Sequence, residues 1–320
     1  MLGQLNLWGK NKVEVAIERL QSFEPKDGYY LAFSGGKDSQ CIYHLAKMAG
    51  VKFDAHYRVT GIDPPELFRF IRKNYPDVSM DIPRDDIKGN PKDNNRVTMW
   101  SLIENSTMPP TRKARYCCEY LKESGGEGRL TVTGVRWAES NNRKANQGEV
   151  TIMKTGRIKE VKLSPDFSPT LRGVVLVNDN TESRRLMEQC VMKGKVTLNP
   201  IIDWEDDDVW EFLNDWAKVP HCELYDQGFK RLGCIGCPMS GSNGMKRDFA
   251  RWPKYKDLYI RAMQKMCDNH PGQIRTAENA IAMGGGSKSS TVGQHGVPLV
   301  DGRIRGILMF EEWRKWKDVR

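Results

Sequence analysis

Long hydrophobic runs are missing from this sequence, since no apolar stretch approaches the roughly 20 residues that a membrane-spanning helix needs. Residues 1–6 also lack the basic segment followed by an apolar core that marks a secretory signal peptide. We therefore expect a protein of the cytoplasm with no membrane partner. Because that compartment is reducing, the eight cysteines are not expected to form disulfides.

Two common phosphate-binding motifs are absent as well. A Walker A loop needs a glycine where Leu31 stands and a serine or threonine after its lysine, where this chain has Asp38. No Gly-x-Gly-x-x-Gly follows the first predicted strand, so the dinucleotide-binding fingerprint is excluded. No internal repeat is evident either.

A glycine-rich turn is present, between an apolar run at 28–33 that predicts a buried strand and a helical pattern from Gln40 onward. Backbone N–H groups at a helix start favour an anion, and paired glycines let a phosphate approach the backbone closely. Two serine hydroxyls and one lysine add donors and positive charge. The pattern predicts a phosphate-binding loop; the alternative is a helix-capping turn whose glycines serve geometry alone. The turn consists of Ser34, Gly35, Gly36, Lys37, Asp38 and Ser39.

The elements around this turn predict an α/β fold with a doubly wound, mostly parallel sheet. A second strand at 54–59 follows the helix, and strand, helix and strand at this spacing form a parallel βαβ unit. Ligands of such sheets lie beyond the carboxyl ends of the strands. We therefore expect Ser34 and the segment that contains Thr60 and Gly61 to face one crevice.

Two cysteine pairs stand out, the vicinal Cys117 and Cys118 and the Cys-x-x-Cys of Cys234 and Cys237. A Cys-x-x-Cys turn alone suits a zinc knuckle, a redox dithiol or an iron–sulfur ligand pair. Vicinal cysteines on a helix splay their sulfurs, which suits a cubane cluster better than a zinc ion. Zinc and ordinary core cysteines remain the alternatives, and Cys222 is a reserve ligand. Cys41 and Cys190 are expected to be small apolar residues of packed elements.

The hexapeptide at 34–39 resembles the PP-loop of the ATP pyrophosphatases and of the adenylylsulfate and phosphoadenylylsulfate (PAPS) reductases. Three later features are similar to the same families: Gly134-Val-Arg136 followed by Glu-Ser, the stretch from Asn199 to Trp210, and the cysteines. On these residues the chain is identified as a member of the PAPS reductase-like PP-loop family over roughly residues 12–140 and 197–260. The resemblance implies an adenine nucleotide alpha hydrolase-like fold.

The resemblance also implies the site residues. Lys37, Asp38 and Arg136 are expected to be catalytic, with Asp38 helping to hold Mg²⁺. Vicinal cysteines far upstream of a Cys-x-x-Cys are the pattern of adenylylsulfate reductases that carry a [4Fe–4S] cluster, which makes Cys117, Cys118, Cys234 and Cys237 the implied ligands. The implied nucleotide-binding residues are Ser34, Gly35, Gly36, Lys37, Asp38, Ser39, Thr60, Gly61, Gly134 and Arg136.

The reaction is inferred from a departure from the reductase pattern. The reductases attack with a cysteine on a C-terminal tail, whereas residues 268–320 contain no cysteine. We therefore expect an enzyme that cleaves ATP between its α- and β-phosphates and adenylates an acceptor for sulfur insertion, similar to the DNA-phosphorothioation and tRNA-thiolation enzymes. The acceptor would be DNA or tRNA, and the sulfur donor a protein such as a cysteine desulfurase. The alternatives are a sulfonucleotide reductase that uses Cys267, and a non-catalytic nucleotide-binding subunit.

Charge and composition predict the domain organisation. Fifty basic against forty-one acidic residues give a net charge of +9, which suits phosphate-rich partners. We expect a nucleotide-binding domain at 1–245 with an insertion or β-hairpin excursion at about 141–196, and a basic helical extension at 246–320 with a Gly/Ser linker near 284–290. Short β-prone runs predict strands at 150–153 and 174–177, and the pattern at 307–316 predicts a terminal amphipathic helix. The four acidic residues at 205–208 predict a helix start, where they complement the helix dipole; a metal cluster is the alternative. One long helix from Lys246 to Cys267 interleaves basic and aromatic residues, which suits nucleic acid; an ordinary solvated helix face is the alternative.

Overall fold

The computed structural model describes residues 2–7, 9–86, 89, 93–153, 158–171, 173–191, 194–270, 309–311 and 313–314, with side chains omitted at 158–160. Two compact units share the chain, each built from three segments. The first unit holds residues 1–58, 65–81 and 125–232, and the second holds 59–64, 82–124 and 233–320. This division does not follow the boundary at 245 expected from the sequence, and the Gly/Ser segment at 284–290 lies outside the described residues.

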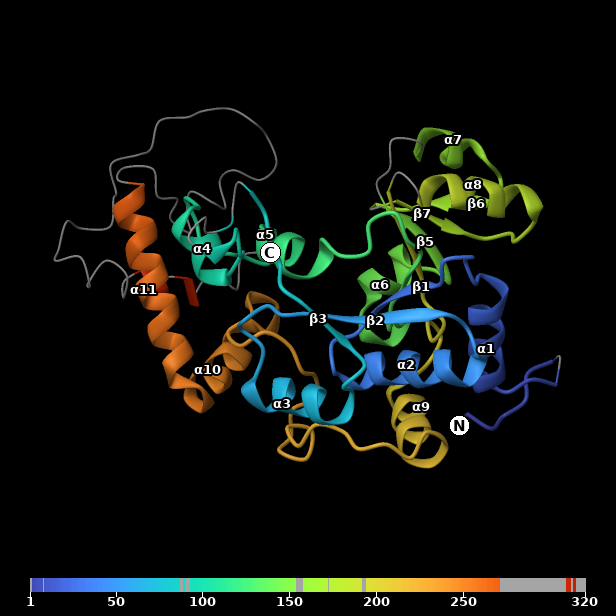
Figure 1. Ribbon diagram of the computed structural model, residues 1–320, viewed down its shortest axis with the longest axis horizontal. Coiled ribbons are helices and arrows are strands. Elements are labelled where there is room, and N and C mark those ends of the chain that lie inside the picture. The colour runs from blue at the N-terminus through green and yellow to red at the C-terminus, as the bar shows by residue number, and fades with distance from the viewer. Residues whose placement is uncertain are drawn as a thin grey trace. The chain divides into compact units, whose positions relative to one another are not determined.

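An eight-stranded sheet organises the first unit (Figure 1), in the order β3-β2-β1-β4-β8-β5-β7-β6. β3, β2, β1, β4 and β8 run parallel to one another. Each of the remaining strands, β5, β7 and β6, pairs antiparallel with the strand before it in this order. The prediction of an α/β fold with a mostly parallel sheet is therefore confirmed. The strands are β1 (Tyr29–Ala32), β2 (Phe53–Arg58), β3 (Ser79–Asp81), β4 (Thr131–Val132), β5 (Val150–Met153), β6 (Phe167–Pro169), β7 (Gly173–Leu176) and β8 (Lys195–Leu198).

The segment at 141–196 extends the main sheet instead of leaving it. Strands were predicted at 150–153 and 174–177, and β5 and β7 lie at or next to these positions. Within it, β6 and β7 form an antiparallel hairpin, and β5 joins this hairpin to the main sheet by pairing with β7 and, over four residue pairs, with β8. Helices α6 (Asn141–Asn146), α7 (Ile158–Leu163) and α8 (Thr181–Val191) connect these strands.

The glycine-rich turn follows β1, the strand at which the strand order reverses. Helix α1 (Lys12–Ser22) starts with a capping box between Asn11 and Glu14 and lies beside α2 (Lys37–Ala49), which also packs against α9 (Asp206–Glu211) (Figure 1). From β1 the chain moves outward through β2 and β3 and then returns to β4 on the other side of β1. Ligand crevices of open α/β sheets form at the carboxyl ends of such strands.

The remaining elements of the first unit are short or lie at its periphery. Helix α3 (Pro65–Asn74) buries Leu67 and Ile71. A 3-10 turn, η3 (Trp137–Glu139), follows β4, and a π-helical turn, η4 (Phe212–Trp216), continues α9.

An aromatic cluster holds the second unit together. The ring of Tyr259 meets those of Trp100, Phe249 and Trp313 at centroid distances of 5.1, 5.6 and 5.0 Å. The predicted terminal helix at 307–316 is helical in the part that is described, and its Trp313 donates to the carbonyl of Pro110 at 2.7 Å. The unit contains α4 (Met99–Glu104), α5 (Tyr116–Cys118), the π-helical η2 (Glu119–Glu123), the 3-10 turn η5 (Pro238–Ser240), α10 (Gly241–Arg251) and α11 (Pro253–Asn269).

The prediction of one long basic helix at 246–267 is wrong, because the chain forms two helices that meet at Trp252 and Pro253. A proline disfavours the helical conformation of the residue before it, and Trp252 has φ −121° and ψ 68°. Of the aromatic residues on this stretch, Phe249 and Trp252 are buried and Tyr255 is half-buried, and nucleic-acid binding there stays a prediction. Their basic neighbours, among them Lys246 and Arg251, are exposed.

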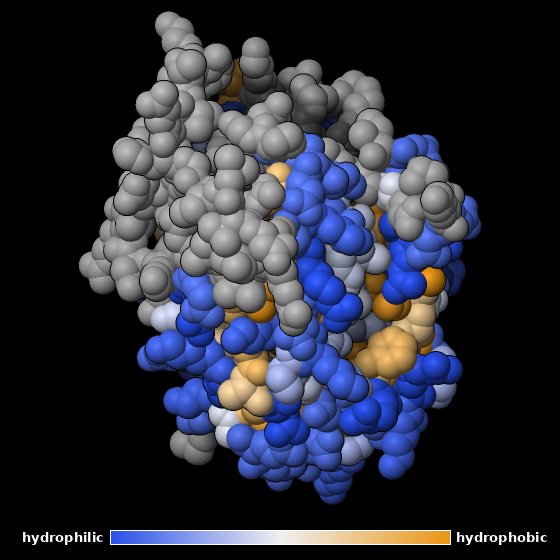
Figure 2. Space-filling model, turned by 90° about the vertical axis from the view of Figure 1, so that its left-hand side faces the viewer, coloured by the Kyte–Doolittle hydropathy of each residue, from blue (hydrophilic) through white to orange (hydrophobic). Residues whose placement is uncertain are grey.

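The outer surface carries mainly hydrophilic residues on the face shown in Figure 2, with apolar residues in small groups between them. Among the described residues, no helix is long and apolar enough to cross a membrane.

Helix α2 carries a histidine whose titration affects stability. Burial lowers the pKa of His44 to about 4, and its Nε2 lies 3.1 Å from the Tyr75 hydroxyl. The unfolded chain binds a proton near the ordinary value of 6.5, where the folded chain does not.

We therefore expect the free energy of unfolding to fall as the pH drops from 6.5 towards 4. In His44→Gln, which has no group that titrates at this position, the free energy of unfolding should fall less over the same pH range. Urea unfolding of both proteins at a series of pH values measures the difference. Parallel pH profiles for the two proteins would contradict the assignment.

Candidate functional site

The predicted phosphate loop lies between β1 and α2, as the sequence indicated. Its serine hydroxyls bind one another at 3.2 Å, and Ser39 also donates to the carbonyl of Gly36 at 2.8 Å. Ser34 accepts the N–H of Gly36 at 3.4 Å. These bonds shape the loop at the start of α2, where the positive end of the helix dipole favours an anion.

Two glycines of the site are required by close contacts. Gly35 has φ +72°, and a Cβ there would lie 2.6 Å from Cγ1 of Ile71 on α3. A Cβ on Gly134 would lie 2.9 Å from the backbone carbonyl of Asp38. Gly134 thus allows the segment after β4 to pack against the loop after β1.

Arg136 connects the loop to α9. Its side chain is 2% exposed, and its Nε donates to Asp38 at 2.7 Å while its Nη2 donates to Asp206 at 2.6 Å. Its Nη1 donates to the carbonyl of Trp204 at 3.1 Å. Lys37, which is also buried, pairs with the same Asp206 carboxylate oxygen. Two cations and two carboxylates of the site therefore form one network.

The network sets the charge state of its members. Burial works against the charge of Arg136, but Asp38 and Asp206 raise its pKa above the ordinary value. Desolvation opposes the charge of Asp206 too, but hydrogen bonds from Lys37 and Arg136 hold its pKa below the ordinary value. Both residues are ionised at neutral pH.

A second group of arginines borders this network. Glu139 binds Arg143 in an ion pair, accepts the backbone N–H of Arg136 at 3.3 Å, and lies 3.7 Å from Nη1 of Arg231. Burial and the nearby Arg231 lower the pKa of Arg143. An anion that reached this edge would meet more than one guanidinium.

Two residues of the site were missed by sequence reasoning. Asp206 was interpreted as one of four acidic residues that complement the dipole of a helix start, which it does in the first turn of α9. Tyr225 accepts the backbone N–H of Lys37 at 2.9 Å and had no assigned role. Neither partnership has a signal in the sequence, because about 170 to 190 residues separate each residue from the loop.

Thr60 and Gly61 belong to the second unit. The Thr60 hydroxyl donates to Asp63 at 2.8 Å and accepts the N–H of Ile62 at 3.2 Å, while Gly61 has φ +75°. These bonds build a tight turn after β2, and the predicted nucleotide contact stays a prediction.

The four cysteines predicted as metal ligands all lie in the second unit. Cys117 and Cys118 hydrogen-bond to each other, and Cys117 interacts electrostatically with Cys234 and Cys237. The turn of the Cys-x-x-Cys is closed by a bond from the N–H of Cys237 to the carbonyl of Cys234 at 3.2 Å.

Contacts on both sides fix this turn. The N–H of Ile235 donates to Ile62 at 2.8 Å, and that of Gly236 donates to the buried Asp248 at 3.1 Å. A Cβ on Gly236, which has φ +69°, would lie 2.4 Å from the ring of Phe249.

Two cations accompany the thiols. Nη2 of Arg115 lies 3.5 Å from Sγ of Cys118, and Lys122 interacts with Cys234 and with Asp63 at 3.7 Å. The hydrogen bond to Cys117, followed by that to Arg115, lowers the pKa of Cys118, whereas burial raises that of Cys234 to about 12.

These donors determine which kind of metal centre the four cysteines could hold. Among the residues described, no group of three or more His, Cys, Asp or Glu side chains is placed to hold a metal ion. Four thiols with interacting charges and two adjacent cations suit an iron–sulfur cluster in donor chemistry, and the ligand assignment stays a prediction.

The other cysteines are buried. Cys41 and Cys190 were interpreted as small apolar residues of packed elements, which is confirmed. Cys222, the reserve ligand, belongs to the first unit and not to the unit of the four predicted ligands. Cys267, the alternative nucleophile, is buried in α11.

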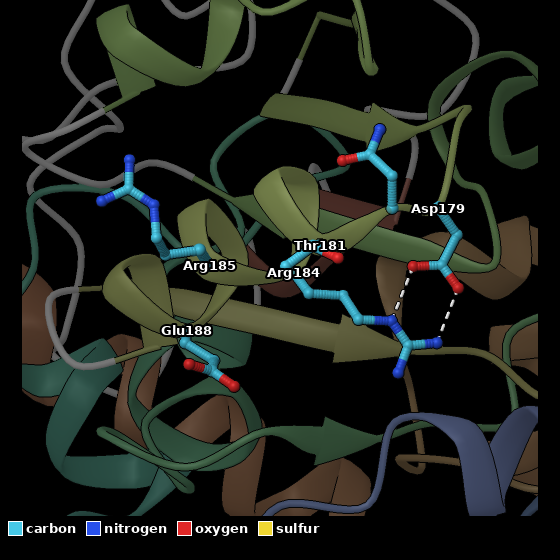
Figure 3. A pocket seen from close by; sticks show the side chains of 6 residues that line it. Asp179, Thr181, Arg184, Arg185 and Glu188 are labelled. Atoms are coloured by element: carbon cyan, nitrogen blue, oxygen red, sulfur yellow. Dashed lines mark hydrogen bonds and ion pairs between the residues drawn. The ribbon is translucent and has the colours of Figure 1, made fainter.

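A pocket on the sheet extension lies apart in sequence from all predicted site residues (Figure 3). Arg184 reaches back to Asp179 with two bonds of 2.8 and 2.6 Å, so its guanidinium already has a carboxylate partner. We assign the pocket no role in the chemistry. Its lining consists of Asp179, Asn180, Thr181, Arg184, Arg185 and Glu188.

The fold and the loop define an α/β protein with a glycine-rich, PP-loop-like turn at the carboxyl end of β1. The profile of the family described as "phosphoadenosine phosphosulfate reductase domain" matches residues 28–240. The chain belongs to this family, and family membership implies an adenine nucleotide as ligand.

Relatives agree with this assignment. Two uncharacterised proteins of Methanocaldococcus jannaschii are 25% and 26% identical over 249 and 248 residues, which cover 73% and 74% of this chain. The chain spans less than half of their length, 42% and 46%. The adenosine 5'-phosphosulfate reductase of Oceanobacillus iheyensis is 40% identical over 57 residues, 18% of this chain and 23% of that enzyme.

Among solved structures, a PAPS reductase from Candida auris in a phosphate complex aligns with 72% of this chain and 96% of its own. Its TM-score is 0.39 and its sequence identity 13%.

The two positive-φ glycines that flank α2 allow a test of the loop. Gly35→Ala and Gly50→Ala introduce the same kind of backbone strain, about 1–2 kcal/mol. Only at Gly35 does the new Cβ meet a side chain, since nothing lies within 4 Å of a Cβ at Gly50. We expect Gly35→Ala to lower the free energy of unfolding by about 1–3 kcal/mol more than Gly50→Ala. Chemical denaturation measures both, and equal losses would contradict the contact with Ile71.

Proposed function

We propose that this protein binds ATP with Mg²⁺, cleaves it between the α- and β-phosphates, and adenylates an acceptor that then receives sulfur. The observation that carries the proposal is the network of Lys37, Arg136, Asp38 and Asp206 beside the loop. It places two cations at the start of α2, where the loop favours an anion.

The cations would act on the departing pyrophosphate. Asp206 pairs with both Lys37 and Arg136, and its side chain is 70% exposed. Pyrophosphate carries more negative charge than one carboxylate, and it would replace Asp206 as their partner. Lys37 and the planar fork of Arg136 would then stabilise the charge that develops on the leaving group.

The reaction consists of two balanced displacements. An acceptor oxygen attacks the α-phosphorus, a new P–O bond forms, and the bond to the bridging oxygen of the β-phosphate breaks to release pyrophosphate. The sulfur of a donor then attacks the acceptor atom that carries the adenylated oxygen. A bond to sulfur forms, the bond to that oxygen breaks, and AMP leaves with the oxygen. Asp38, whose carboxylate lies next to the loop, would supply an oxygen ligand for Mg²⁺.

Cys117, Cys118, Cys234 and Cys237 would hold a [4Fe–4S] cluster in the second unit. A cluster bound there would supply sulfur or electron transfer chemistry. Arg115 and Lys122 would offset the negative charge of the thiolates.

A nucleic-acid acceptor, DNA or tRNA, is consistent with the net charge of +9 and with the exposed basic residues of α10 and α11. A cysteine desulfurase would suit the role of sulfur donor. Its persulfide sulfur would form a disulfide with the acceptor, and a second thiol would have to reduce this disulfide to leave the sulfur on the product.

Sulfonucleotide reduction is the second candidate, favoured by the 40% identity to an adenosine 5'-phosphosulfate reductase over 57 residues. The burial of Cys267 speaks against that residue as the nucleophile. A reductase reaction on this chain would therefore need a thiol from elsewhere.

We expect the full chain to release pyrophosphate from ATP and Mg²⁺ only when an acceptor is present, in a screen of DNA and tRNA. Lys37→Ala should lower this rate about 100-fold or more, because it removes a charge aimed at the leaving group. The matched control is Lys47→Ala, at the exposed end of the same helix. Sulfite release from adenylylsulfate or PAPS, without pyrophosphate release from ATP, would replace the proposal with the second candidate.

Cluster binding has a readout that needs no activity. After anaerobic reconstitution, Cys234→Ser should lose bound iron and acid-labile sulfide, whereas Cys190→Ala, which changes a buried cysteine of α8, should keep both. Equal iron and sulfide in the two variants would exclude Cys234 as a ligand.

A further inference from the structure

Tyr225 places a hydroxyl against the phosphate loop from a segment distant in sequence. Its oxygen accepts the backbone N–H of Lys37, the first residue of α2, at 2.9 Å. A Cβ on Gly36 would lie 3.4 Å from the same oxygen, an ordinary contact distance, so the hydroxyl lies directly against the loop. The hydroxyl therefore lies at the helix start, where an anion is favoured.

Neighbouring rings hold Tyr225 in this position. The rings of Tyr225 and Trp210 meet edge to face at 5.0 Å, and that of His221 lies 6.2 Å away. Trp210 also lies under the ammonium of Lys37 at 5.9 Å. Trp210 therefore contacts both the ring of Tyr225 and the ammonium of Lys37.

The direction of the bond from Lys37 decides what the hydroxyl can do next. A phenol oxygen that accepts an N–H keeps its own proton free to donate. Among the described residues, no acceptor for that proton is found. Burial raises the pKa of Tyr225, so the group stays a neutral donor across the neutral pH range.

We propose that Tyr225 is a further phosphate-binding residue of the loop, whose hydroxyl donates a hydrogen bond to the pyrophosphate portion of the nucleotide. This inference rests on the proposed function, since it extends the same anion site. The bond from Lys37 fixes the hydroxyl in advance, which reduces the entropy lost when the ligand binds. Tyr225 would distinguish ligands with a pyrophosphate group from those with one phosphate.

The test uses Tyr225→Phe in the full chain, because phenylalanine keeps the packing on Trp210 and removes only the hydroxyl. The matched control is Tyr29→Phe, which removes a buried hydroxyl that donates to the carbonyl of Leu20 at 2.7 Å in the same unit. Calorimetric titrations with inorganic pyrophosphate and with AMP, both with Mg²⁺, give the affinities. Thermal unfolding verifies that each variant is folded.

We expect Tyr225→Phe to bind pyrophosphate about tenfold more weakly and AMP with unchanged affinity, and Tyr29→Phe to match the wild type for both. If Tyr225→Phe bound pyrophosphate with unchanged affinity, the inference about Tyr225 would be overturned and the proposed function would stand. Tighter binding would have the same meaning, because it would show that the hydroxyl hinders the ligand. A wild-type chain that binds neither pyrophosphate nor ATP would overturn the proposed function together with it.

Discussion

The buried guanidinium of Arg136 is the interaction on which the site depends. It joins the loop after β1, the segment after β4 and the start of α9 through Asp38, the carbonyl of Trp204 and Asp206. A buried arginine is costly unless its donors are satisfied, and three of them are bonded here. Removing either carboxylate would leave charge uncompensated, so the three segments hold one another in place.

The same network makes the site ready for an anion before any ligand arrives. Asp206 keeps Lys37 and Arg136 close together, where two unpaired cations would repel each other. An internal carboxylate therefore maintains a geometry that suits a phosphate. Most of the Asp206 side chain is exposed, and its displacement would need little rearrangement of the core.

The sequence predicted those parts of the fold and site that depend on local pattern. The apolar run before Ser34 and the glycines after it gave the strand, loop and helix, and the strand at 150–153 was found from its β-branched residues. Partners such as Tyr225 could not be predicted, because long-range contacts leave no local signal. The helix break at Pro253 did have a local signal, the proline itself. The helical periodicity on either side nevertheless favoured the interpretation as one continuous helix. Periodicity shows that a helix has an apolar face but not which element covers it, so the burial of Phe249 in α10 had no signal in the sequence.

The interleaving of the two units has a consequence for how the protein can be divided. Each unit consists of three segments that alternate along the chain, so the backbone passes between the units five times. No single cleavage or truncation point yields either unit whole. A fragment that ends before residue 233 would retain 59–64 and 82–124 but lose Cys234, Cys237 and the helices that pack with them. The glycine-rich loop and the cysteine turn therefore have to be expressed as one piece, although they belong to different units.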